Sequence, residues 1–411
     1  MNRIVIVGGG LAGARTAEAL RAGGFAGELT MIGAEPHLPY DRPPLSKAVL
    51  KGEADDTTLE TDLDALRCER LLARRATGLR LAGDAGGAVE TTAGSVAFDG
   101  LVIATGATPI TLPGDGPYRV LRTIDDARAL RSVLLPGRRL VIVGAGWIGA
   151  EVATAAALAG CEVTVVEAAD VPLAVALEPE VGALTAPWYA EAGVELRHGV
   201  KVASVEDGGL ALAGGGFIDA HDVLIGIGVR PETRWLTDSG LELDNGVVVD
   251  GALRAFAGGS GGPSPLERDG TVRPEIVAAG DCAAWWSARY GRRLRVEHWD
   301  AALNAPDVAA ASLLGKDATY DPVPYFWSEQ FGRMVQYAGL HQGAERLLMR
   351  GDPGDRKWAA CWLSGDRLDA ILTVDRPRDL VQGRRIMAAG GRVDPDLLAD
   401  PEVPVRNAVP S

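Results

Sequence analysis

The stretch LVIVGAGWIGAEV, Leu140 to Val152, decides how this chain folds. It begins as a hydrophobic segment typical of a buried strand and passes through a glycine turn into a helical pattern. The same arrangement stands near the start of the chain, in RIVIVGGGLAGARTAEAL, Arg3 to Leu20. Strand, glycine turn and helix form the usual cradle for the pyrophosphate of a dinucleotide, so the sequence predicts two such cradles.

Each cradle has three glycines with G-x-G-x-x-G spacing and an acidic residue at the end of the next strand. The first glycine permits the tight turn, the second lets the backbone approach phosphate, and the third lets helix pack on strand. Glu35 and Glu167 are placed to accept hydrogen bonds from a ribose, and a carboxylate at Glu167 favours NADH over NADPH. The glycines are Gly8, Gly10 and Gly13 in the first cradle and Gly144, Gly146 and Gly149 in the second.

The composition bounds the class of protein. A chain of 411 residues suits two or three domains, and 47% hydrophobic with 23% charged residues is ordinary for a globular protein. The formal charge of -14 argues against nucleic acid as a partner. The four cysteines form neither a CxxC motif nor a metal-ligand cluster, so the sequence predicts no disulfide scaffold and no metal site.

The sequence predicts no membrane segment. The apolar run from Leu140 to Gly160 has about the length of a membrane span, but Glu151 at its centre and the turn glycines before it favour a buried strand, turn and helix. The N-terminus enters a strand within three residues, which leaves no room for a signal peptide. We therefore expect a cytoplasmic protein without a membrane partner.

Apolar runs alternate with helical patterns in two series, which indicates an α/β fold with two Rossmann-like dinucleotide-binding domains. After about Tyr320 the pattern changes to aromatic, strand-like segments followed by a helix from about Arg376 to Gly390, as in a separate α+β domain. A glycine-rich and proline-rich stretch, Ala255 to Gly270, is expected to be a surface insertion. The predicted domains are a discontinuous first domain (1–110 and 241–319), a second domain (111–240) and a C-terminal α+β domain (320–411).

Several further motifs support a resemblance over nearly the whole chain. The motifs are GGGLAG, RPPLSK, LVIATG, LRT, GAGWIGAEV, GIGVRP, AAGDCA, VEHWDAALN and FWSEQ. Together they resemble the FAD-dependent, NADH-utilising ferredoxin reductases of the putidaredoxin reductase and biphenyl dioxygenase reductase type, within the pyridine nucleotide disulfide reductase superfamily. The resemblance implies that the first cradle holds FAD and the second admits NADH.

The resemblance also implies individual cofactor contacts. At Asp281 we expect the start of a helix that faces the ribityl and phosphate part of FAD. In addition to Gly8, Gly10 and Gly13, the expected FAD contacts are Ala12, Glu35, Lys47, Ala76, Arg122, Asp281 and Trp299. The expected NADH contacts are Gly144, Gly146, Ile148, Gly149, Glu167 and Gly228. Trp147, inside the second cradle, is expected near the nicotinamide.

Three residues carry the expected catalytic roles. The resemblance places Lys47 beside the flavin N5 edge, paired with Glu151, in a pair that joins the two nucleotide domains. The positive end of such a pair can stabilise charge on a reduced flavin. Trp327, in FWSEQ, is expected to abut the isoalloxazine on the route by which electrons leave.

Disulfide reductases of this superfamily carry a redox-active cysteine pair beside the flavin, whereas the corresponding segment here, RPPLSKAVLKGEA, contains no cysteine. The electrons must therefore pass to an external acceptor. The resemblance implies a two-iron two-sulfur ferredoxin that serves a monooxygenase or dioxygenase, and a reductase that is a monomer or weak dimer. Because such ferredoxins are usually acidic, the run RYGRRLR, with Arg289, Arg292, Arg293 and Arg295, is a candidate docking face. Arg384 and Arg385, in the C-terminal domain, are further candidates.

Other readings stay open. The same fold could serve an NADH oxidase, a quinone reductase or a rubredoxin reductase, or a non-catalytic flavoprotein that changes shape or partner on binding NADH. The chain also departs from the family pattern. Val171 and Val175 stand where relatives often place arginines that grip NADH, and Glu232 stands where asparagine is common. NAPD, Asn304 to Asp307, lacks the usual glutamine and glycine, which argues against an undisturbed helix facing the flavin.

Overall fold

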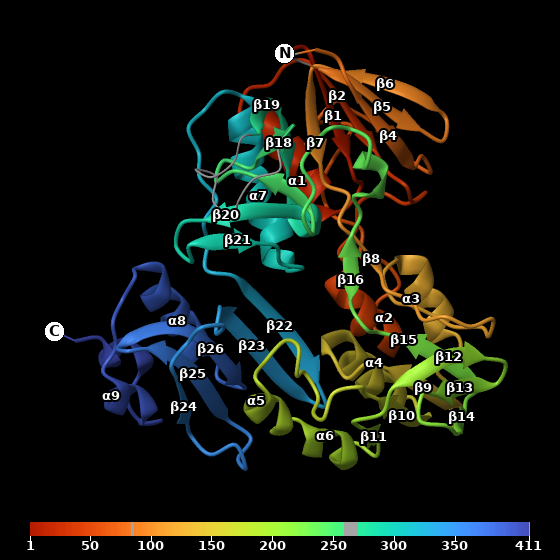
Figure 1. Cartoon of the computed structure of the whole chain (residues 1–411), viewed down its shortest axis with the longest axis vertical. Coiled ribbons are helices and arrows are strands. Elements are labelled where there is room, and N and C mark those ends of the chain that lie inside the picture. The colour runs from red at the N-terminus through yellow and green to blue at the C-terminus, as the bar shows by residue number, and fades with distance from the viewer. Residues whose placement is uncertain (84–85, 259–269, 411) are drawn as a thin grey trace. The chain divides into compact units, whose positions relative to one another are not determined.

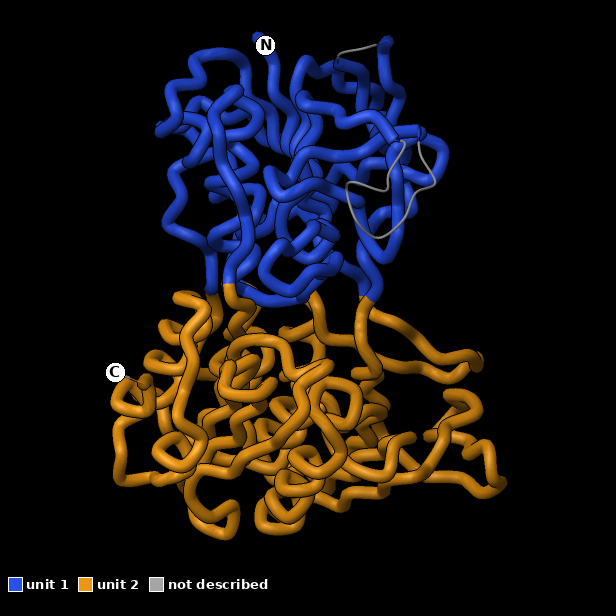
Figure 2. The backbone as a smooth tube through the Cα atoms, turned by 60° about the vertical axis from the view of Figure 1, so that its left-hand side comes forward, with its two compact units in different colours: residues 1–41, 57–108, 230–322 blue, residues 42–56, 109–229, 323–411 orange. Residues whose placement is uncertain are grey.

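The computed structural model describes residues 1–83, 86–258 and 270–410. The chain forms two compact units (Figure 2). Unit 1 comprises residues 1–41, 57–108 and 230–322, and unit 2 comprises residues 42–56, 109–229 and 323–411. A two-stranded pair, β8 (Ala107–Pro109) with β16 (Val229–Pro231), lies where the chain passes from one unit to the other.

Unit 1 is built around a nine-stranded sheet in the described part of the chain (Figure 1). Its central strands are parallel, because crossover connections return the chain to the end of the sheet at which each strand begins. Strand β1 is buried after its first residue, as expected for a strand covered on both faces. In spatial order the strands are β21 (Arg292–Leu294), β20 (Ala283–Ser287), β17 (Val247–Val249), β18 (Arg254–Ala257), β19 (Thr271–Ala278), β7 (Gly100–Ile103), β1 (Arg3–Val7), β2 (Glu28–Ile32) and β3 (Cys68–Leu71).

Two helices of unit 1, α1 (Leu11–Ala22) and α7 (Trp299–Leu313), pack against each other beside this sheet. The 3-10 helices η2 (Arg234–Leu236) and η4 (Gly280–Cys282) complete the helical elements described here. A small antiparallel sheet contains β4 (Ala76–Leu81), β5 (Gly87–Thr91) and β6 (Gly94–Phe98).

Unit 2 contains a second parallel sheet, with the order β11 (Glu195–Arg197), β10 (Glu162–Val166), β9 (Arg139–Val143) and β15 (Asp222–Ile225). A small antiparallel sheet accompanies it, formed by β12 (Val202–Glu206), β13 (Gly209–Leu212) and β14 (Phe217–Asp219). The helical elements in this part are η1 (Pro43–Ser46), α2 (Ala48–Lys51), α3 (Ile124–Arg131), α4 (Trp147–Leu158), α5 (Pro179–Ala183) and α6 (Ala186–Glu191).

The C-terminal part of unit 2 is a five-stranded antiparallel sheet. Its strands are, in order, β22 (Tyr325–Gln330), β23 (Arg333–Gly339), β26 (Arg367–Val374), β25 (Trp358–Ser364) and β24 (Arg346–Arg350). One face packs on the hydrophobic side chains of α5 and α6, and the amphipathic helix α8 (Pro377–Ala388) covers the other (Figure 1). The chain ends with α9 (Pro395–Ala399) and η5 (Val405–Ala408).

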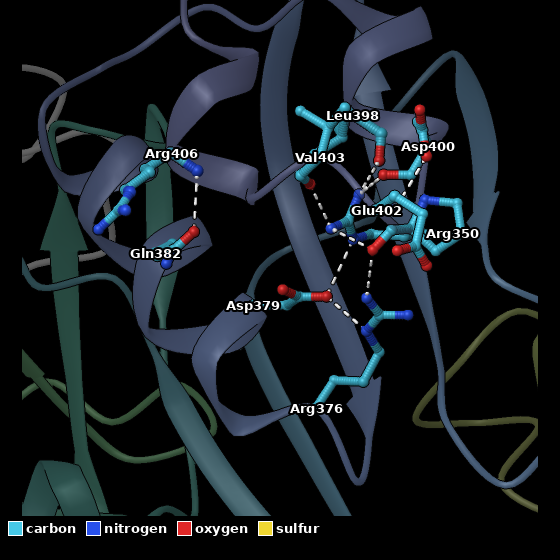
Figure 3. Close-up of polar contacts among 10 residues, drawn as sticks. Arg350, Arg376, Asp379, Gln382, Leu398, Asp400, Glu402, Val403 and Arg406 are labelled. Carbon is cyan, nitrogen blue, oxygen red and sulfur yellow. Dashed lines mark hydrogen bonds and ion pairs between the residues drawn. The ribbon is translucent and has the colours of Figure 1, made fainter.

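A buried arginine of β24, Arg350, links the C-terminal segment that contains α9 to the five-stranded sheet (Figure 3). Arg350, at the end of β24, is 1% exposed and forms an ion pair with Asp379 of α8 at 2.9 Å. Its remaining guanidinium hydrogens reach backbone carbonyls of the C-terminal segment, including Leu398 at 2.9 Å, Val403 at 2.6 Å and Asp400. A second arginine, Arg376, shares Asp379 at 2.6 Å. A guanidinium has five donors and no acceptor, so this geometry satisfies a charge that would otherwise be costly to bury.

The predicted fold class, an α/β fold with two dinucleotide-binding domains and a C-terminal α+β domain, is confirmed. The helix expected near Arg376 to Gly390 is α8. The disturbance expected at NAPD is absent, because α7 continues from Trp299 to Leu313 with Pro306 inside it. Most of the insertion expected at Ala255 to Gly270 lies outside the described residues. None of the helices in the described part of the chain combines the length and apolarity that a membrane span needs.

Candidate functional site

The first cradle lies in unit 1, between β1 and α1. Gly8 has a φ of +129°, and a Cβ built there would lie 2.0 Å from the carbonyl oxygen of Ala104. A Cβ on Gly13 would lie 2.0 Å from the carbonyl oxygen of Gly8. At Gly10, by contrast, a Cβ would meet no heavy atom of the described chain within 4 Å. The first and third glycines are thus required by the protein itself, whereas the second leaves open space at the start of α1.

The second cradle repeats this geometry in unit 2, between β9 and α4. Gly144 has a φ of +103°, and its Cβ would lie 2.4 Å from the carbonyl oxygen of Gly226. A Cβ on Gly149 would lie 2.0 Å from the carbonyl oxygen of Gly144, while a Cβ on Gly146 would meet open space among the described residues. The segments around Gly10 and Gly146, which are 136 residues apart, therefore adopt the same turn conformation.

Both cradles fit a dinucleotide pyrophosphate. Gly10 and Gly146 are the N-cap residues of α1 and α4, and neither helix start is occupied by a side-chain cap from the described chain. The first amide hydrogens of a helix have no intrahelical acceptor, and the helix dipole adds positive potential there. Amide hydrogens without an acceptor at the start of a helix bind phosphate, and the open space beside the second glycine lets the phosphate approach them.

The acidic residues occupy the expected places after the second strand of each cradle. Glu35 follows β2 and accepts a hydrogen bond from the Tyr40 hydroxyl at 2.6 Å. Glu167 follows β10, where one carboxylate oxygen accepts from the amide of Ala145 at 2.7 Å and the other from Ala169 at 2.8 Å. These bonds hold Glu167 against the glycine turn, so its negative charge lies at the place where a ribose would bind.

Among the other expected FAD contacts of unit 1, the turn that carries Asp281 lies beside Ala12 of α1. Gly280 packs near Ala12, since a Cβ on Gly280 would lie 3.2 Å from the Ala12 side chain. The indole nitrogen of Trp299 donates to Asp41 at 2.7 Å. Ala76 begins β4. Burial lowers the pKa of His298 to about 4, although nearby Asp281 acts in the opposite direction, so this imidazole is neutral at pH 7.

The helix expected to start at Asp281 is only a short 3-10 helix in the structure. The segment Gly280–Cys282 is a single 3-10 turn, and β20 follows it directly. The helical turn goes no further because Ala283 to Ser287 pair with β17 and β21 in the sheet, which satisfies their backbone groups.

The remaining expected NADH contacts lie at the mouth of the second cradle or beside it. Ile148 is partly exposed in the first turn of α4. Gly228 has a φ of +109°, and its carbonyl accepts a hydrogen bond from the Ile110 amide.

Val175, one of the departures from the family pattern, lies on a segment that contacts the second cradle. Its side chain is 98% exposed, on a segment that bonds to the glycine turn through the Leu173 amide and the Ala145 carbonyl. An arginine at this position would add a cation beside the cradle that this chain lacks.

Lys47 and Glu151 form the ion pair that the sequence predicts, with Nζ 2.8 Å from the carboxylate. Glu151 lies inside α4 and is 3% exposed. The segment of residues 42–56 that carries Lys47 belongs to the same compact unit as α4. The pair therefore lies within unit 2, and its role in joining the two nucleotide domains stays a prediction. Arg122, also expected at FAD, lies in unit 2 as well, where its carbonyl accepts from Arg42.

Two serines that the sequence interpretation missed complete the surroundings of Glu151. Ser46 and Ser328 both donate hydroxyl hydrogens to its carboxylate, Ser328 at 2.6 Å. Each serine is adjacent to an expected catalytic residue, in RPPLSK and FWSEQ. A buried carboxylate needs several donors, so a search for hydroxyl groups beside the two motifs could have found them.

Trp327 lies on β22, the strand that carries Ser328. Successive residues of a strand face opposite sides of the sheet. Phe326 and Ser328 face α4, where Phe326 packs edge-on against Trp147 with ring centres 4.6 Å apart. Trp327 and Tyr325 face the other way and stack with ring centres 6.1 Å apart. The position of Trp327 at a flavin stays a prediction.

The cysteines are free thiols, as the sequence predicts. Burial raises the pKa of the Cys68 thiol to about 11 and that of Cys361 to about 12, and it also raises the pKa of Cys282 and Cys161. Because the thiolate is the reactive form, these are poor nucleophiles at neutral pH. Within the described residues there is no cluster of His, Cys, Asp or Glu that could hold a metal ion.

Comparison with protein families gives two matches that together span most of the chain. Residues 2–305 match the family described as pyridine nucleotide-disulphide oxidoreductase, and residues 325–409 match the family described as reductase C-terminal. The chain belongs to the pyridine nucleotide-disulphide oxidoreductase family. This family assignment agrees with the two glycine cradles, one in each unit.

Individual relatives match nearly the whole length of this pyridine nucleotide-disulphide oxidoreductase. The ferredoxin–NAD(+) reductase component of the anthranilate 1,2-dioxygenase system of Burkholderia cepacia is 38% identical over 97% of both chains. The crystal structure of Fdr9 has a TM-score of 0.90 and 48% identity, covering 98% of this chain and 99% of that one. The covalent putidaredoxin reductase–putidaredoxin complex contains a chain with a TM-score of 0.90 and 32% identity, covering 99% and 98%. The predicted family resemblance is confirmed.

Proposed function

We propose that this protein is an NADH-dependent ferredoxin reductase, which passes electrons from NADH through FAD to a two-iron two-sulfur ferredoxin that serves a monooxygenase or dioxygenase. The observation that carries the proposal is the pair of matching glycine cradles in a chain whose cysteines are all unpaired. Two dinucleotides can bind, and electrons have no internal disulfide to reach. The names of the relatives, a ferredoxin–NAD(+) reductase component and putidaredoxin reductase, support the acceptor.

Each cradle has a separate task in this proposal. The amides at the start of α1 hold the FAD pyrophosphate, with Ala12, Glu35, Ala76, Asp281 and Trp299 around it. When bound, FAD supplies the step that accepts a hydride and releases electrons singly. Lys47, held in place by its ion pair with Glu151, provides positive potential at the flavin, together with Arg122.

The second cradle serves NADH. The amides at the start of α4 bind its pyrophosphate, and Glu167 accepts the ribose hydroxyls. The bonds from Ala145 and Ala169 fix the Glu167 carboxylate, which would repel the 2′-phosphate of NADPH. NADH is therefore the expected reductant.

A steady-state assay tests the proposed acceptor. The purified protein is mixed with NADH and cytochrome c, with and without an oxidised two-iron two-sulfur ferredoxin. We expect cytochrome c reduction to depend on the ferredoxin, with slow NADH oxidation in its absence. Rapid NADH oxidation by oxygen or a quinone alone would indicate an oxidase or quinone reductase. Very slow flavin reduction with a long-lived charge-transfer complex would indicate a non-catalytic NADH-responsive protein.

Alkylation tests the absence of thiol chemistry. Iodoacetamide applied to the NADH-reduced enzyme at pH 7.5 is expected to leave ferredoxin-dependent turnover unchanged, because the thiols are unpaired and their pKa values are raised. Mass spectrometry reports which cysteines are modified, and half-buried Cys161 is expected to react before the three buried ones. Inactivation that follows the modification of a cysteine pair would contradict the proposed electron route.

Charge reversal tests the candidate docking face. In the structure Arg293 pairs with Asp244 at 2.5 Å and Arg295 with Glu297 at 2.8 Å, so local carboxylates already offset part of this charge. We expect an Arg292→Glu, Arg293→Glu variant to raise the apparent KM for ferredoxin by roughly 3-fold to 10-fold and to flatten its salt dependence, since charges at the rim of an interface mainly affect association. The KM for NADH is the internal control. An unchanged KM and salt dependence for ferredoxin would remove this face from the docking site.

We also propose a cytoplasmic monomer or weak dimer. Free thiols suit a reducing compartment. Sedimentation of the flavin-loaded protein across a range of concentrations tests the assembly state, and a stable higher oligomer would contradict it.

A further inference from the structure

The carboxylate of Glu151 divides its two oxygens between two separate segments of unit 2. One oxygen, Oε2, accepts from Ser46 and from Lys47, at the end of η1. The other, Oε1, accepts from the Ser328 hydroxyl at 2.6 Å and from the Glu329 amide at 3.3 Å, both on β22. One buried carboxylate thus links the lysine segment to the strand that carries Trp327.

The number of hydrogens that each group carries determines the direction of the hydrogen bonds at Ser328. The Nε2 atom of Gln330 lies 3.1 Å from the Ser328 hydroxyl oxygen, and an amide nitrogen can only donate. Ser328 has a single hydroxyl hydrogen, which it must therefore give to the Glu151 carboxylate. Gln330 is 1% exposed, so the amide has little freedom to turn away. The result is a directed chain from Gln330 through Ser328 to Glu151, which Lys47 meets from the other side.

Lys47 depends on this carboxylate for its position. Apart from Glu151, its ammonium group contacts the carbonyl of Pro43 at 3.2 Å. If Ser328 lost its hydroxyl, Oε1 would retain the Glu329 amide, whose 3.3 Å distance is at the long end of the normal range. The carboxylate could then rotate within its site, and the ammonium would follow it.

We propose that Ser328, oriented by Gln330, is a positioning residue that acts through Glu151 on Lys47. This inference rests on the proposed function, in which Lys47 works at the flavin. Ser328 also faces α4 beside Phe326, which packs on Trp147 of the second cradle. The same strand contact therefore holds the lysine in place and anchors the strand that bears Trp327 to the helix of the NADH cradle.

Rapid mixing of the flavin-loaded enzyme with NADH, without oxygen, is the first test. The Ser328→Ala variant is expected to lower the limiting rate of flavin reduction about 10-fold, as the loss of one hydrogen bond to a charged group predicts, with less than about a 3-fold change in the Kd for NADH. Ser328→Thr keeps a hydroxyl and is expected to restore most of the rate. Ser204→Ala is the matched control, because Ser204 also donates to a carboxylate, that of Glu206 at 2.8 Å, but lies on β12. Its rate should equal that of the wild type.

A double-mutant cycle separates positioning from a merely structural role. In a Lys47→Met background, Ser328→Ala is expected to cause no further slowing, because the group that it positions is gone. A full additional 10-fold loss in that background, or equal slowing by Ser328→Thr and Ser328→Ala, would overturn the proposal.

Thermal unfolding supplies a readout that does not depend on turnover. Ser328→Ala is expected to lower the Tm of the wild type and to have a much smaller effect in a Glu151→Ala background; equal shifts in both would overturn the hydrogen-bonded chain. If NADH fails to reduce the wild-type flavin, the proposed function fails, and the unfolding cycle still decides whether Ser328 acts through Glu151.

Discussion

The Gly146→Val variant is expected to purify with its flavin in place but to need roughly 100-fold more NADH for half-maximal flavin reduction. A Cβ at Gly146 enters space that the described chain leaves open, and the residue has extended backbone angles that valine adopts without strain. The protein should therefore fold, while the side chain blocks the amides that would bind the NADH pyrophosphate. Loss of one or two hydrogen bonds to a charged group corresponds to about this factor. A titration of flavin absorbance with NADH measures it.

The matched variant Gly10→Val should have the opposite phenotype. Gly10 occupies the same position in the first cradle, also with extended angles and open space. We expect this protein to purify colourless, with a normal far-ultraviolet circular dichroism spectrum as the control for folding. If Gly10→Val retains flavin and Gly146→Val loses it, the two cradles have been assigned to the wrong cofactors.

Loss of the Arg350 side chain is expected to be the most destabilising single change in the C-terminal part of unit 2. Arg350→Met removes a buried cation that pairs with Asp379 and donates to carbonyls of the C-terminal segment, including Leu398 and Val403 (Figure 3). Removing one partner of a buried ion pair typically costs about 3–5 kcal/mol. Urea unfolding followed by tryptophan fluorescence measures the change in the free energy of unfolding.

An exposed arginine of the same part provides the control. Arg356 pairs with Asp375 at 2.9 Å, but its side chain is 69% exposed. Surface pairs contribute about 0–1 kcal/mol, so Arg356→Met should change the free energy of unfolding by less than about 1 kcal/mol. Equal effects of Arg350→Met and Arg356→Met would mean that the buried network does not stabilise the C-terminal segment.

The two cradles could be predicted from the sequence because their chemistry is local. Gly8 and Gly144 need positive φ angles, and Gly13 and Gly149 need the absence of a side chain, so the same residue types recur at the same spacing. Strand, turn and helix follow one another within about twenty residues. Such a signal survives without any knowledge of the tertiary structure.

The surroundings of Glu151 could not be predicted in the same way. Ser46, Glu151 and Ser328 are distant in sequence, and the bonds among them depend on how three segments of unit 2 pack together. The motifs pointed to Lys47 and Trp327, but the neighbouring serines become candidates only when Glu151 is recognised as a buried carboxylate that needs hydrogen-bond donors. The assignment of residues 42–56 to unit 2 escaped prediction for a similar reason, because a short segment can leave its sequence neighbours and pack elsewhere.

The stabilising contacts of Arg350 could not be predicted from the sequence either. An arginine at the end of a strand reads as a surface residue, since arginine is seldom fully buried. The structure buries it because α8 supplies Asp379 and the C-terminal segment supplies carbonyl acceptors, all of which come later in the chain. A partner set assembled from remote segments leaves no periodic pattern in the sequence.

Anaerobic rapid mixing tests the central claim, that a flavin held by unit 1 takes electrons from NADH and gives them to a ferredoxin. The purified yellow protein is mixed first with one equivalent of NADH and then with oxidised two-iron two-sulfur ferredoxin, while flavin and ferredoxin absorbance are followed separately. We expect NADH to bleach the flavin faster than NADPH does, and two ferredoxins to be reduced as the flavin absorbance returns. A colourless protein that cannot be reconstituted with FAD, or a flavin that NADH does not bleach, would contradict this function.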